Sequence, residues 1–423
     1  MTEAENAILL REMFDVALRA VSADLCLPAH LPQPVAGRTL ILGVGKAAAA
    51  MVRVAMTRME GPRDAIVLTR YGHGEPPGAM PESVRVFEAG HPLPDRHGLD
   101  ATRIILDAVR RLGAEDQLLM LVSGGGSALL TMPAPTISLE DKQAVTRALL
   151  ACGASISEIN CVRTHLSAIK GGRLAQAAYP ARVVTLAMSD IPGDDPALVA
   201  SGPTVADRTK LSEARHILDM YAIDRPAAVD AALRDDANET PFADAIGLPD
   251  STVRVVARSR HAMEAAGELA NAMGYRPIYL GDDVEGDATE IGTVHAALAL
   301  HYAGKGGRFA LLSGGETTVR VRNPAGRGGR NSAYLVSLAL ALNGARDIYA
   351  LACDTDGIDG TQDNAGAVIT PSSLARAGAL GLSAAELLDD NRTYDVFAAL
   401  GDLVVTGPTR TNVNDLRIIL IDR

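Results

Sequence analysis

The stretch 118–130, LLMLVSGGGSALL, decides the fold of the first half of the chain. Five apolar residues, Leu118 to Val122, run directly into the loop SGGGS at 123–127. A short apolar run closed by turn residues is typical of a buried strand. Glycines free the backbone to turn N–H groups toward a ligand, and two serine hydroxyls add donors that suit an anionic oxygen. If a helix begins at Ala128, its N-terminal dipole favours an anion at the same place.

The same loop has a plainer interpretation as a tight strand-to-helix turn, for which three glycines suffice. A similar sequence pattern later in the chain favours the anion-binding interpretation. The stretch 311–317, LLSGGET, repeats the apolar run and the SGG motif and adds the carboxylate of Glu316. We therefore expect both loops to bind a phosphate or a carboxylate.

Composition limits the classes of partner. The chain has 423 residues, enough for two domains, with 48% hydrophobic and 22% charged residues, which is typical of a globular enzyme. A net charge of −11 argues against nucleic acid as a partner, and aromatic residues at 3%, without Trp, leave few platforms for stacking bases. A small anionic substrate stays open, because a local cluster of cations can bind one.

Four scattered cysteines (Cys26, Cys152, Cys161 and Cys353) form no CxxC pair and no metal-binding spacing. They indicate buried thiols in a reducing compartment. The acidic N-terminus MTEAENAILLREMF does not resemble a signal peptide, and no uncharged run reaches the length of a membrane span. We therefore expect a cytoplasmic protein that does not contact a membrane.

Strands alternate with helices through the first half, which indicates a parallel, doubly wound sheet. The run 38–44, RTLILGV, reads as a buried strand and 46–59 as a helix, joined by Gly43-Val44-Gly45-Lys46. The carboxyl end of a strand before a helix is the usual anion site of an α/β sheet. A lysine on a solvated helix face is the commonest kind, yet the glycines on its strand side favour a functional Lys46.

Acidic residues follow two further apolar strands. The strand 182–188 ends in SDIPGDD, which contains Asp190, and the strand 348–353 ends in DTDGIDG, which contains Asp354 and Asp356. Such carboxylates suit Mg²⁺, which takes one or two of them together with phosphates and water. Turns held by Asp side chains look similar.

Cations and carboxylates together favour phosphoryl transfer, which depends on positioning and on neutralising the transferred group. The cations are Lys46 and Arg330, the latter in the glycine-rich loop 323–331. The P-loop spacing GxxxxGK(S/T) and the protein-kinase signatures are absent. The pattern Gly43-x-Gly45-x-x-Ala48 keeps a dinucleotide-dependent dehydrogenase as the alternative. The least apolar passage, between 219 and 251, suggests a domain boundary there.

Ten passages match one known family in order and cover nearly the whole chain. They are GVGKAAAAM (43–51), EAGHPLPD (88–95), LVSGGGSALL (121–130), IKGGRLA (169–175), SDIPGDDP (189–196), ASGPT (200–204), LLSGGETTV (311–319), GRGGRN (326–331), DTDGIDG (354–360) and TGPTRTNVNDL (406–416). On these motifs the chain resembles the class II glycerate 2-kinases with a C-terminal MOFRL domain. Some members of that family carry the name hydroxypyruvate reductase.

The resemblance implies two α/β domains with the active site in the cleft between them. We expect an N-terminal Rossmann-like domain with a doubly wound parallel sheet at 1–240 and a smaller MOFRL-type domain at 241–423. The implied reaction is ATP-dependent phosphorylation of the 2-hydroxyl of D-glycerate to 2-phosphoglycerate, with Mg²⁺. The oligomeric state stays open, with a homodimer as one possibility.

Carried over by position, Lys46, Arg330 and Asp356 look like the family's catalytic residues. In our hypothesis Lys46 and Arg330 stabilise the transferred phosphoryl group, and Asp356 accepts the hydroxyl proton or helps to hold the metal. The residues expected to bind substrate or phosphate are Gly45, Ser123, Gly124, Gly125, Gly126, Ser127, Ser313, Gly314 and Gly315. Those expected to bind the metal are Asp190, Glu316 and Asp354.

Two departures from the family pattern bear on ligand contacts. Ser332-Ala333 follow GGRN where the family often has Gln-Glu, and Thr164 replaces a usual basic residue. An NAD(P)H-dependent hydroxypyruvate reductase remains the alternative function, and a binding protein for a small anion is a third.

Overall fold

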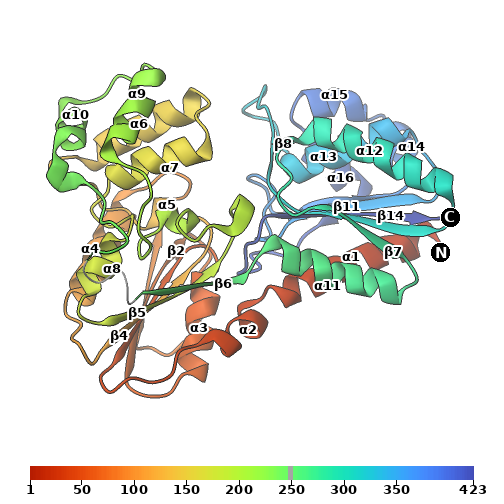
Figure 1. Cartoon of the computed structure of the whole chain (residues 1–423). Coiled ribbons are helices and arrows are strands. Elements are labelled where there is room, and N and C mark those ends of the chain that lie inside the picture. The colour runs from red at the N-terminus through yellow and green to blue at the C-terminus, as the bar shows by residue number, and fades with distance from the viewer. Residues whose placement is uncertain (246–250) are drawn as a thin grey trace. The chain divides into compact units, whose positions relative to one another are not determined.

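The computed structural model describes residues 1–245 and 251–423 (Figure 1). Its contacts divide the chain into two compact units. One unit, here called the N-terminal unit, is Cys26–Val256, and the other, the C-terminal unit, is Met1–Leu25 together with Ala257–Arg423. None of the described helices combines the length and the apolarity that a membrane span needs.

The N-terminal unit is built on a six-stranded sheet in the order β3-β2-β1-β4-β5-β6. Its strands are β1 (Thr39–Val44), β2 (Arg63–Arg70), β3 (Val84–Ala89), β4 (Gln117–Val122), β5 (Arg182–Met188) and β6 (Thr252–Ala257). The pairs β1–β2, β1–β4, β2–β3 and β4–β5 are parallel. This order is that of the doubly wound fold, as expected, and its switch point lies between β1 and β4.

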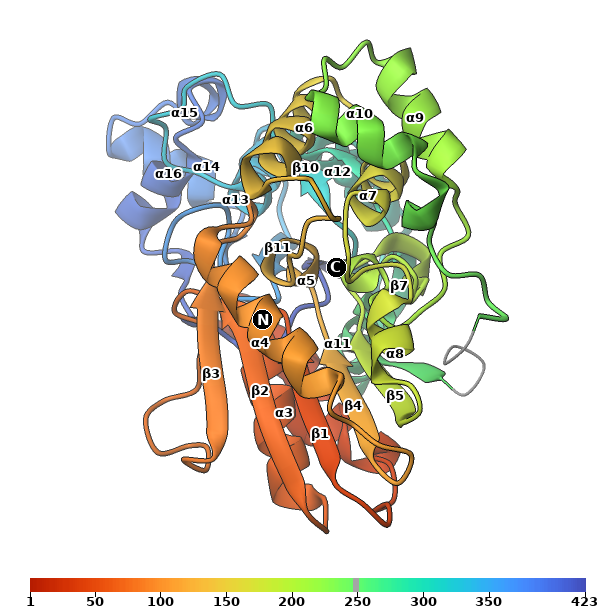
Figure 2. The same ribbon diagram turned by 90° about the vertical axis from the view of Figure 1, so that its left-hand side faces the viewer.

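Both faces of this sheet are covered, which explains why β1 and β4 are buried along their whole length. Figure 2 shows α4 (Arg96–Val109) in front of the strands and α3 (Ala48–Arg58) behind them. Leu42 and Leu118 face the core that contains Ile105 of α4. On the α3 side Gly43 allows close packing, because an added Cβ would lie 2.5 Å from Val52 Cγ2.

The remaining α-helices of this unit have between 4 and 13 residues. They are α5 (Gly126–Leu129), α6 (Leu139–Ala151), α7 (Ile156–His165), α8 (Arg173–Ala178), α9 (Leu211–Met220) and α10 (Ala227–Arg234). Ser138 and Ser155 start α6 and α7 with capping boxes. Helices α6, α7, α9 and α10 enclose a small core of their own, to which Leu149, Val162 and Leu218 belong.

The C-terminal unit has a second six-stranded sheet, in the order β13-β12-β11-β14-β9-β7. Its strands are β7 (Arg276–Gly281), β9 (Arg308–Ser313), β11 (Ile348–Asp354), β12 (Gly366–Ile369), β13 (Leu403–Val404) and β14 (Asp415–Asp422), and β8 (Gly286–Asp287) pairs separately with β10 (Thr317–Thr318). In the described part of this sheet β7 and β9 pair in parallel, and the pairs β11–β12, β11–β14, β12–β13 and β14–β9 are antiparallel.

Two helical layers cover this second sheet (Figure 1). Helices α12 (Ala288–Lys305) and α13 (Arg330–Leu342) share a core with one face. Helices α1 (Glu3–Ala20) and α11 (Ser259–Ala272) pack on the other. The smaller helices are α2 (Ala23–Cys26), at which the chain leaves this unit, and α14 (Ser373–Ala379), α15 (Ala384–Asp389) and α16 (Thr393–Leu400).

The structural units differ from the expected domains 1–240 and 241–423 in two places: at the N-terminus and at the boundary between the domains. Helix α1 belongs to the C-terminal unit, where the Tyr275 hydroxyl donates to Asn6 Oδ1 at 2.8 Å and the N-terminal ammonium lies 3.1 Å from Asp422. Strand β6 is the edge strand of the N-terminal sheet. The amphipathic pattern of a helix in the sequence indicates that one face is buried, but it does not indicate which sheet covers that face.

Two local features near the loops differ from the sequence interpretation. The helix considered from Ala128 is the single turn α5, which begins at Gly126. The helix dipole therefore adds little at this loop. Arg330, expected in a glycine-rich loop, is instead the first residue of α13.

Helix α12 carries a buried histidine that makes stability depend on pH. His295 Nδ1 lies 2.9 Å from the Tyr334 hydroxyl, and burial lowers the pKa of His295 to about 4. The unfolded chain takes up this proton near its ordinary pKa of about 6.5, so folding stability is retained above that pH and falls as pH drops toward 4. We expect a loss of about 2 kcal/mol between pH 7 and pH 5 from this residue.

Urea unfolding at the two pH values measures this effect. His295→Gln should remove that part of the pH dependence, whereas His301→Gln, on an exposed position of the same helix, should keep it. Equal pH dependence in the wild type and in His295→Gln would contradict the assignment.

Candidate active site

The turn after β1 is filled by the loop after β4. The Lys46 N–H donates to Gly124 O at 2.9 Å, and the Ala47 N–H donates to Ser123 Oγ at 3.0 Å. Gly45, with φ 122°, lets the two loops meet, because an added Cβ would lie 2.3 Å from Ser123 Oγ. The N–H groups of Lys46 and Ala47 therefore hold the two loops together and are not available to a phosphate.

The loop Ser123–Ser127 presents a different set of donors. The N–H groups of Ser123 and Gly126 donate to protein carbonyls, whereas those of Gly124 and Gly125 meet no acceptor within the described residues. Gly125 takes φ 83°, a left-handed conformation that favours glycine. Gly125 and Ser127 are the partly exposed members of this loop.

Lys46 and His91 flank this loop. A Cβ added to Gly125 would lie 3.5 Å from Lys46 Cγ and 3.3 Å from His91 Nε2. Lys46 is only partly exposed and precedes α3, so it is not a lysine on a solvated helix face. The structure thus brings the predicted lysine and the predicted SGGGS loop together.

A strained segment lies against the same loop. Ala200, Ser201 and Gly202 take φ values of 52°, 60° and 55°, and Gly126 packs so closely that an added Cβ would lie 2.7 Å from Ala200 Cβ. Left-handed non-glycine residues cost energy and often occur at functional sites. Ser201 Oγ lies 2.9 Å from Ser127 Oγ.

The segment 163–173 carries four basic or potentially basic residues, Arg163, His165, Lys170 and Arg173, and none of them is on an exposed face. Lys170 is fully buried and donates to Ala200 O at 3.1 Å, so it supports the strained segment. Burial lowers the pKa of Lys170 well below its ordinary value. His165 is also fully buried, between Cys161 O and Glu239 Oε1.

Arg330 is the centre of an ionic cluster in the C-terminal unit. Its Nε donates to Asp415 Oδ1 at 2.9 Å, its Nη2 donates to Asp354 Oδ2 at 2.7 Å, and its Nη1 donates to Glu316 Oε1. Burial alone would lower the pKa of the guanidinium, but the charges of Asp415, Asp354 and Glu316 raise it. Arg330 is therefore held permanently charged and in one orientation.

Sheet register explains the cluster. Asp354 and Asp415 are direct cross-strand partners on β11 and β14, where two carboxylates would repel each other. Arg330 contacts both of them, and the buried Arg417 binds Asp415 Oδ2 at 2.7 Å. The two arginines thus neutralise carboxylates that the sheet forces together.

The turn after β11 has a structural carboxylate beside the predicted catalytic one. Asp359 is fully buried and accepts the N–H groups of Asn331 and Ser332, both at 2.9 Å, so it caps α13 directly after Arg330. Burial raises the pKa of Asp359. Asp356 is also buried, and its Oδ1 accepts the Ile358 N–H at 2.9 Å.

The second SGG motif, Ser313-Gly314-Gly315, serves close packing. The Gly314 N–H donates to Gly281 O at 2.8 Å, and Gly314 O accepts from Arg417 at 3.0 Å. A Cβ added to Gly315 would lie 2.3 Å from Val284 N. The Gly314 N–H is therefore already satisfied by the protein, and the motif's clearest contribution is to place Glu316 beside Arg330.

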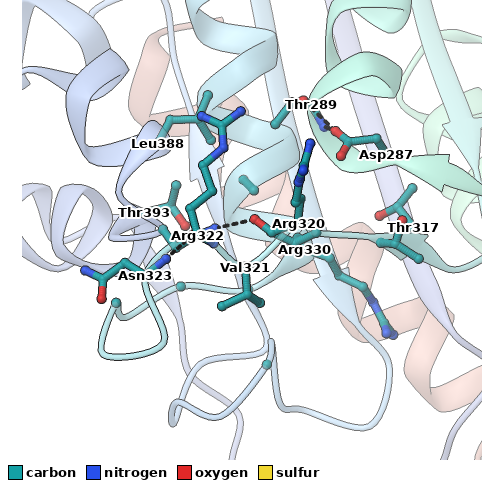
Figure 3. A pocket seen from close by; sticks show the side chains of 18 of the residues that line it. Asp287, Thr289, Thr317, Arg320, Val321, Arg322, Asn323, Arg330, Leu388 and Thr393 are labelled. Atoms are coloured by element: carbon teal, nitrogen blue, oxygen red, sulfur yellow. Dashed lines mark hydrogen bonds between the residues drawn. The ribbon is translucent and has the colours of Figure 1, made fainter. Parts of the chain in front are cut away.

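A cavity of about 640 Å³ lies on the C-terminal unit (Figure 3). Its wall includes Arg320, Arg322 and Arg330, the apolar Leu388, and the glycines at 326, 328 and 329. The lining also holds the carboxylates of Asp287, Glu316 and Asp389. Asp389 pairs with Arg322 and Glu316 with Arg330, so the guanidinium of Arg320 is the group that most favours an anionic ligand.

Comparisons with known proteins agree along the whole chain. Two family models match: the domain of unknown function DUF4147 at residues 9–234 and the MOFRL family at 309–415. The D-glycerate 2-kinase of Thermotoga maritima is 36% identical over 415 residues, which is 97% of each chain. The crystal structure of glycerate kinase from Thermotoga maritima superposes with a TM-score of 0.87 and 34% identity, and covers 99% of this chain and all of that one.

The chain belongs to the glycerate kinase family that carries a C-terminal MOFRL domain. One relative with higher identity has a different name. A putative hydroxypyruvate reductase of Agrobacterium vitis is 48% identical over 419 residues, 98% of this chain and 94% of that protein. Membership of this enzyme family, and the two α/β units, confirm the resemblance inferred from the ten motifs.

The three expected metal ligands of this glycerate kinase family member belong to two different units. Glu316 and Asp354 both bind Arg330, and Asp190 lies in the other unit. No group of three or more His, Cys, Asp or Glu suited to a metal occurs within residues 1–245 and 251–423. The acidic groups present still suit Mg²⁺, because this ion needs only one or two carboxylates when phosphates and water supply the rest.

Several residues that shape the site had not been singled out from the sequence. They are Ser201, Asp415, Arg417 and Asn331. Ser201 and Asp415 lie inside the matched motifs ASGPT and TGPTRTNVNDL. A signal was thus present, but it did not say which residue of each motif acts.

Proposed function

We propose that this chain is an ATP- and Mg²⁺-dependent glycerate 2-kinase. It would transfer a phosphoryl group to the 2-hydroxyl of D-glycerate and release 2-phosphoglycerate and ADP. The names of the relatives from Thermotoga maritima support a kinase of this substrate. A cytoplasmic location and a homodimer stay predictions.

The observation that carries this proposal is that the loop after β4 already occupies the turn after β1. A dinucleotide-dependent dehydrogenase binds the pyrophosphate at that turn, through N–H groups at the start of the following helix. Here the N–H groups of Lys46 and Ala47 already donate to Gly124 O and Ser123 Oγ. A nicotinamide dinucleotide bound in the usual way would have to separate these two loops.

The roles of the charged residues follow from what phosphoryl transfer requires. Negative charge on the transferred group is stabilised by fixed cations, and we assign this to Arg330 and Lys46. The rigid setting of Arg330 among three carboxylates supports that assignment, since a preorganised cation needs no reorganisation during the reaction. Bound Mg²⁺ would neutralise phosphate charge, with Asp354, Glu316 or Asp190 as candidate ligands.

The acceptor side needs a base and an anion site for the substrate carboxylate. Asp356 is the candidate base that takes the proton of the 2-hydroxyl. The N–H groups of Gly124 and Gly125, together with Ser127 and its partner Ser201, are the candidate carboxylate or phosphate site. Gly45, Ser123 and Gly314 act by holding backbones in place, as their contacts indicate, and Ser313 is the buried last residue of β9.

The alternative is an NAD(P)H-dependent hydroxypyruvate reductase. The name of the Agrobacterium vitis relative favours it. It would need the β1 turn to open, or a dinucleotide site elsewhere.

An assay coupled to enolase tests the reaction and its regiochemistry together. Enolase acts directly on 2-phosphoglycerate, so phosphoenolpyruvate should form from D-glycerate, ATP and Mg²⁺ without added phosphoglycerate mutase. Because enolase itself requires Mg²⁺, the metal dependence is measured by ADP release without enolase, which EDTA should stop and excess Mg²⁺ should restore. Product that reaches enolase only after mutase is added would show phosphorylation of the 3-hydroxyl instead.

A further inference from the structure

We propose that the cavity of the C-terminal unit binds the nucleotide, with the polyphosphate along Arg320 and Arg322 and its reacting end at Arg330. This inference rests on the proposed kinase function. It assigns the ATP site to the C-terminal unit rather than to the doubly wound sheet.

The size of the cavity points to a nucleotide. Its volume of about 640 Å³ lies within the usual range of small-molecule sites, roughly 300–1,000 Å³. A three-carbon hydroxy acid would leave most of this space empty. A nucleoside triphosphate would occupy it.

The charges in the wall suit a polyphosphate. Arg322 pairs with Asp389 at 3.0 Å and Arg330 with Glu316, whereas Arg320 forms no ion pair with any described residue. Both side chains of the Arg322–Asp389 pair are exposed, so exchanging this carboxylate for a phosphate costs little. Guanidinium groups bind phosphate oxygens in a bidentate manner.

The two arginines stand on a segment that the protein fixes. The Asn391 side chain accepts the N–H groups of Arg322 and Asn323, at 2.7 and 3.1 Å, and donates to Arg320 O at 3.1 Å. Figure 3 shows Arg320 and Arg322 directed to one side of this segment and Val321 to the other. Because these anchoring bonds use backbone atoms of the segment, replacing the arginine side chains leaves them in place.

Helix α13 cannot supply the phosphate site by itself. The N–H groups of Asn331 and Ser332 at its start donate to Asp359. These two N–H groups are therefore not available to a phosphate, and we assign its binding to the arginine side chains. The apolar Leu388, which Figure 3 places next to Arg322, provides a surface for the base at that end of the cavity.

Calorimetric titration of the full chain with ADP tests the proposal. The double variant Arg320→Gln/Arg322→Gln should bind ADP at least about tenfold more weakly than the wild type and show a raised KM for ATP. The KM for D-glycerate should stay within about twofold, because a distinct site binds the acid. Arg346→Gln, an exposed position of the same unit, is the matched control and should bind ADP normally.

The outcomes separate this inference from the proposed function. A wild type that phosphorylates D-glycerate, paired with a folded double variant that binds ADP normally, would overturn the nucleotide site alone. A double variant with a raised KM for D-glycerate and unchanged ADP binding would also overturn it. A wild type that neither binds ADP nor phosphorylates D-glycerate would remove the proposed function and this inference with it. Thermal melts followed by circular dichroism, with Arg320→Lys as the charge-conserving variant, establish that the variants fold.

Discussion

Arg330→Ala is expected to lower kcat for D-glycerate phosphorylation by about 10²- to 10³-fold, the usual effect of removing one preorganised charge donor. The same change leaves Asp415, which is fully buried, and Asp354 with less neutralising charge. Breaking a buried ion pair costs about 3–5 kcal/mol, so the variant should also be less stable. Steady-state kinetics and urea unfolding measure the two effects separately.

Arg330→Lys separates charge from geometry. Lysine keeps a positive charge near the carboxylates but cannot make the three directed contacts of the guanidinium. It should therefore retain much of the stability while kcat stays low. Arg327→Ala, an exposed arginine three residues earlier whose guanidinium lies over Tyr394, is the control with near-normal turnover. Near-normal kcat in either Arg330 variant would remove this residue from the catalytic role.

Lys46→Met is expected to lower kcat by about 10²-fold or more, because it deletes the cation beside the SGGGS loop and keeps a side chain of similar length. The hydrogen bonds that join the turn after β1 to Ser123 and Gly124 use the backbone N–H groups of Lys46 and Ala47, which the substitution retains. Stability should therefore change much less than activity.

Lys210→Met is the matched control, since Lys210 is an exposed lysine of the same unit. It should leave kcat and KM unchanged. If Lys46→Met turned over D-glycerate like Lys210→Met, the assignment of Lys46 to the transferred phosphoryl group would be lost.

The strands with strong apolar runs were predictable. The expected strand 182–188 is β5, and the expected strands 38–44 and 348–353 match β1 and β11 to within one residue, because each run is bounded by turn residues. The central strand β14 was not assigned from the sequence, although its residues Arg417–Ile421 are buried. The first sheet was predicted from the alternation of strands with helices. No helix follows the apolar run of β14, so that pattern does not identify this strand.

The candidate site was predictable only where neighbouring parallel strands bring two motifs together. Lys46 and the SGGGS loop are neighbours through the β1–β4 pairing of a doubly wound sheet, which the strand–helix alternation predicts. The Arg330 cluster depends on the register that sets Asp354 opposite Asp415, strands that are distant in sequence. No pattern within either strand reports that register.

The roles of the glycines were equally difficult to predict from the sequence. A glycine that exposes its N–H groups and one that admits a close neighbour look alike in a sequence. Gly125 belongs to the first kind, and Gly45 and Gly314 belong to the second. Only the three-dimensional contacts distinguish them.

A paired assay of one purified preparation tests the central claim most directly. One arm contains D-glycerate, ATP and Mg²⁺ with detection of 2-phosphoglycerate, and the other contains hydroxypyruvate with NADH or NADPH and detection of nicotinamide oxidation. The account predicts turnover in the first arm and none in the second. Nicotinamide oxidation in the second arm, with no phosphorylated product in the first, would contradict it.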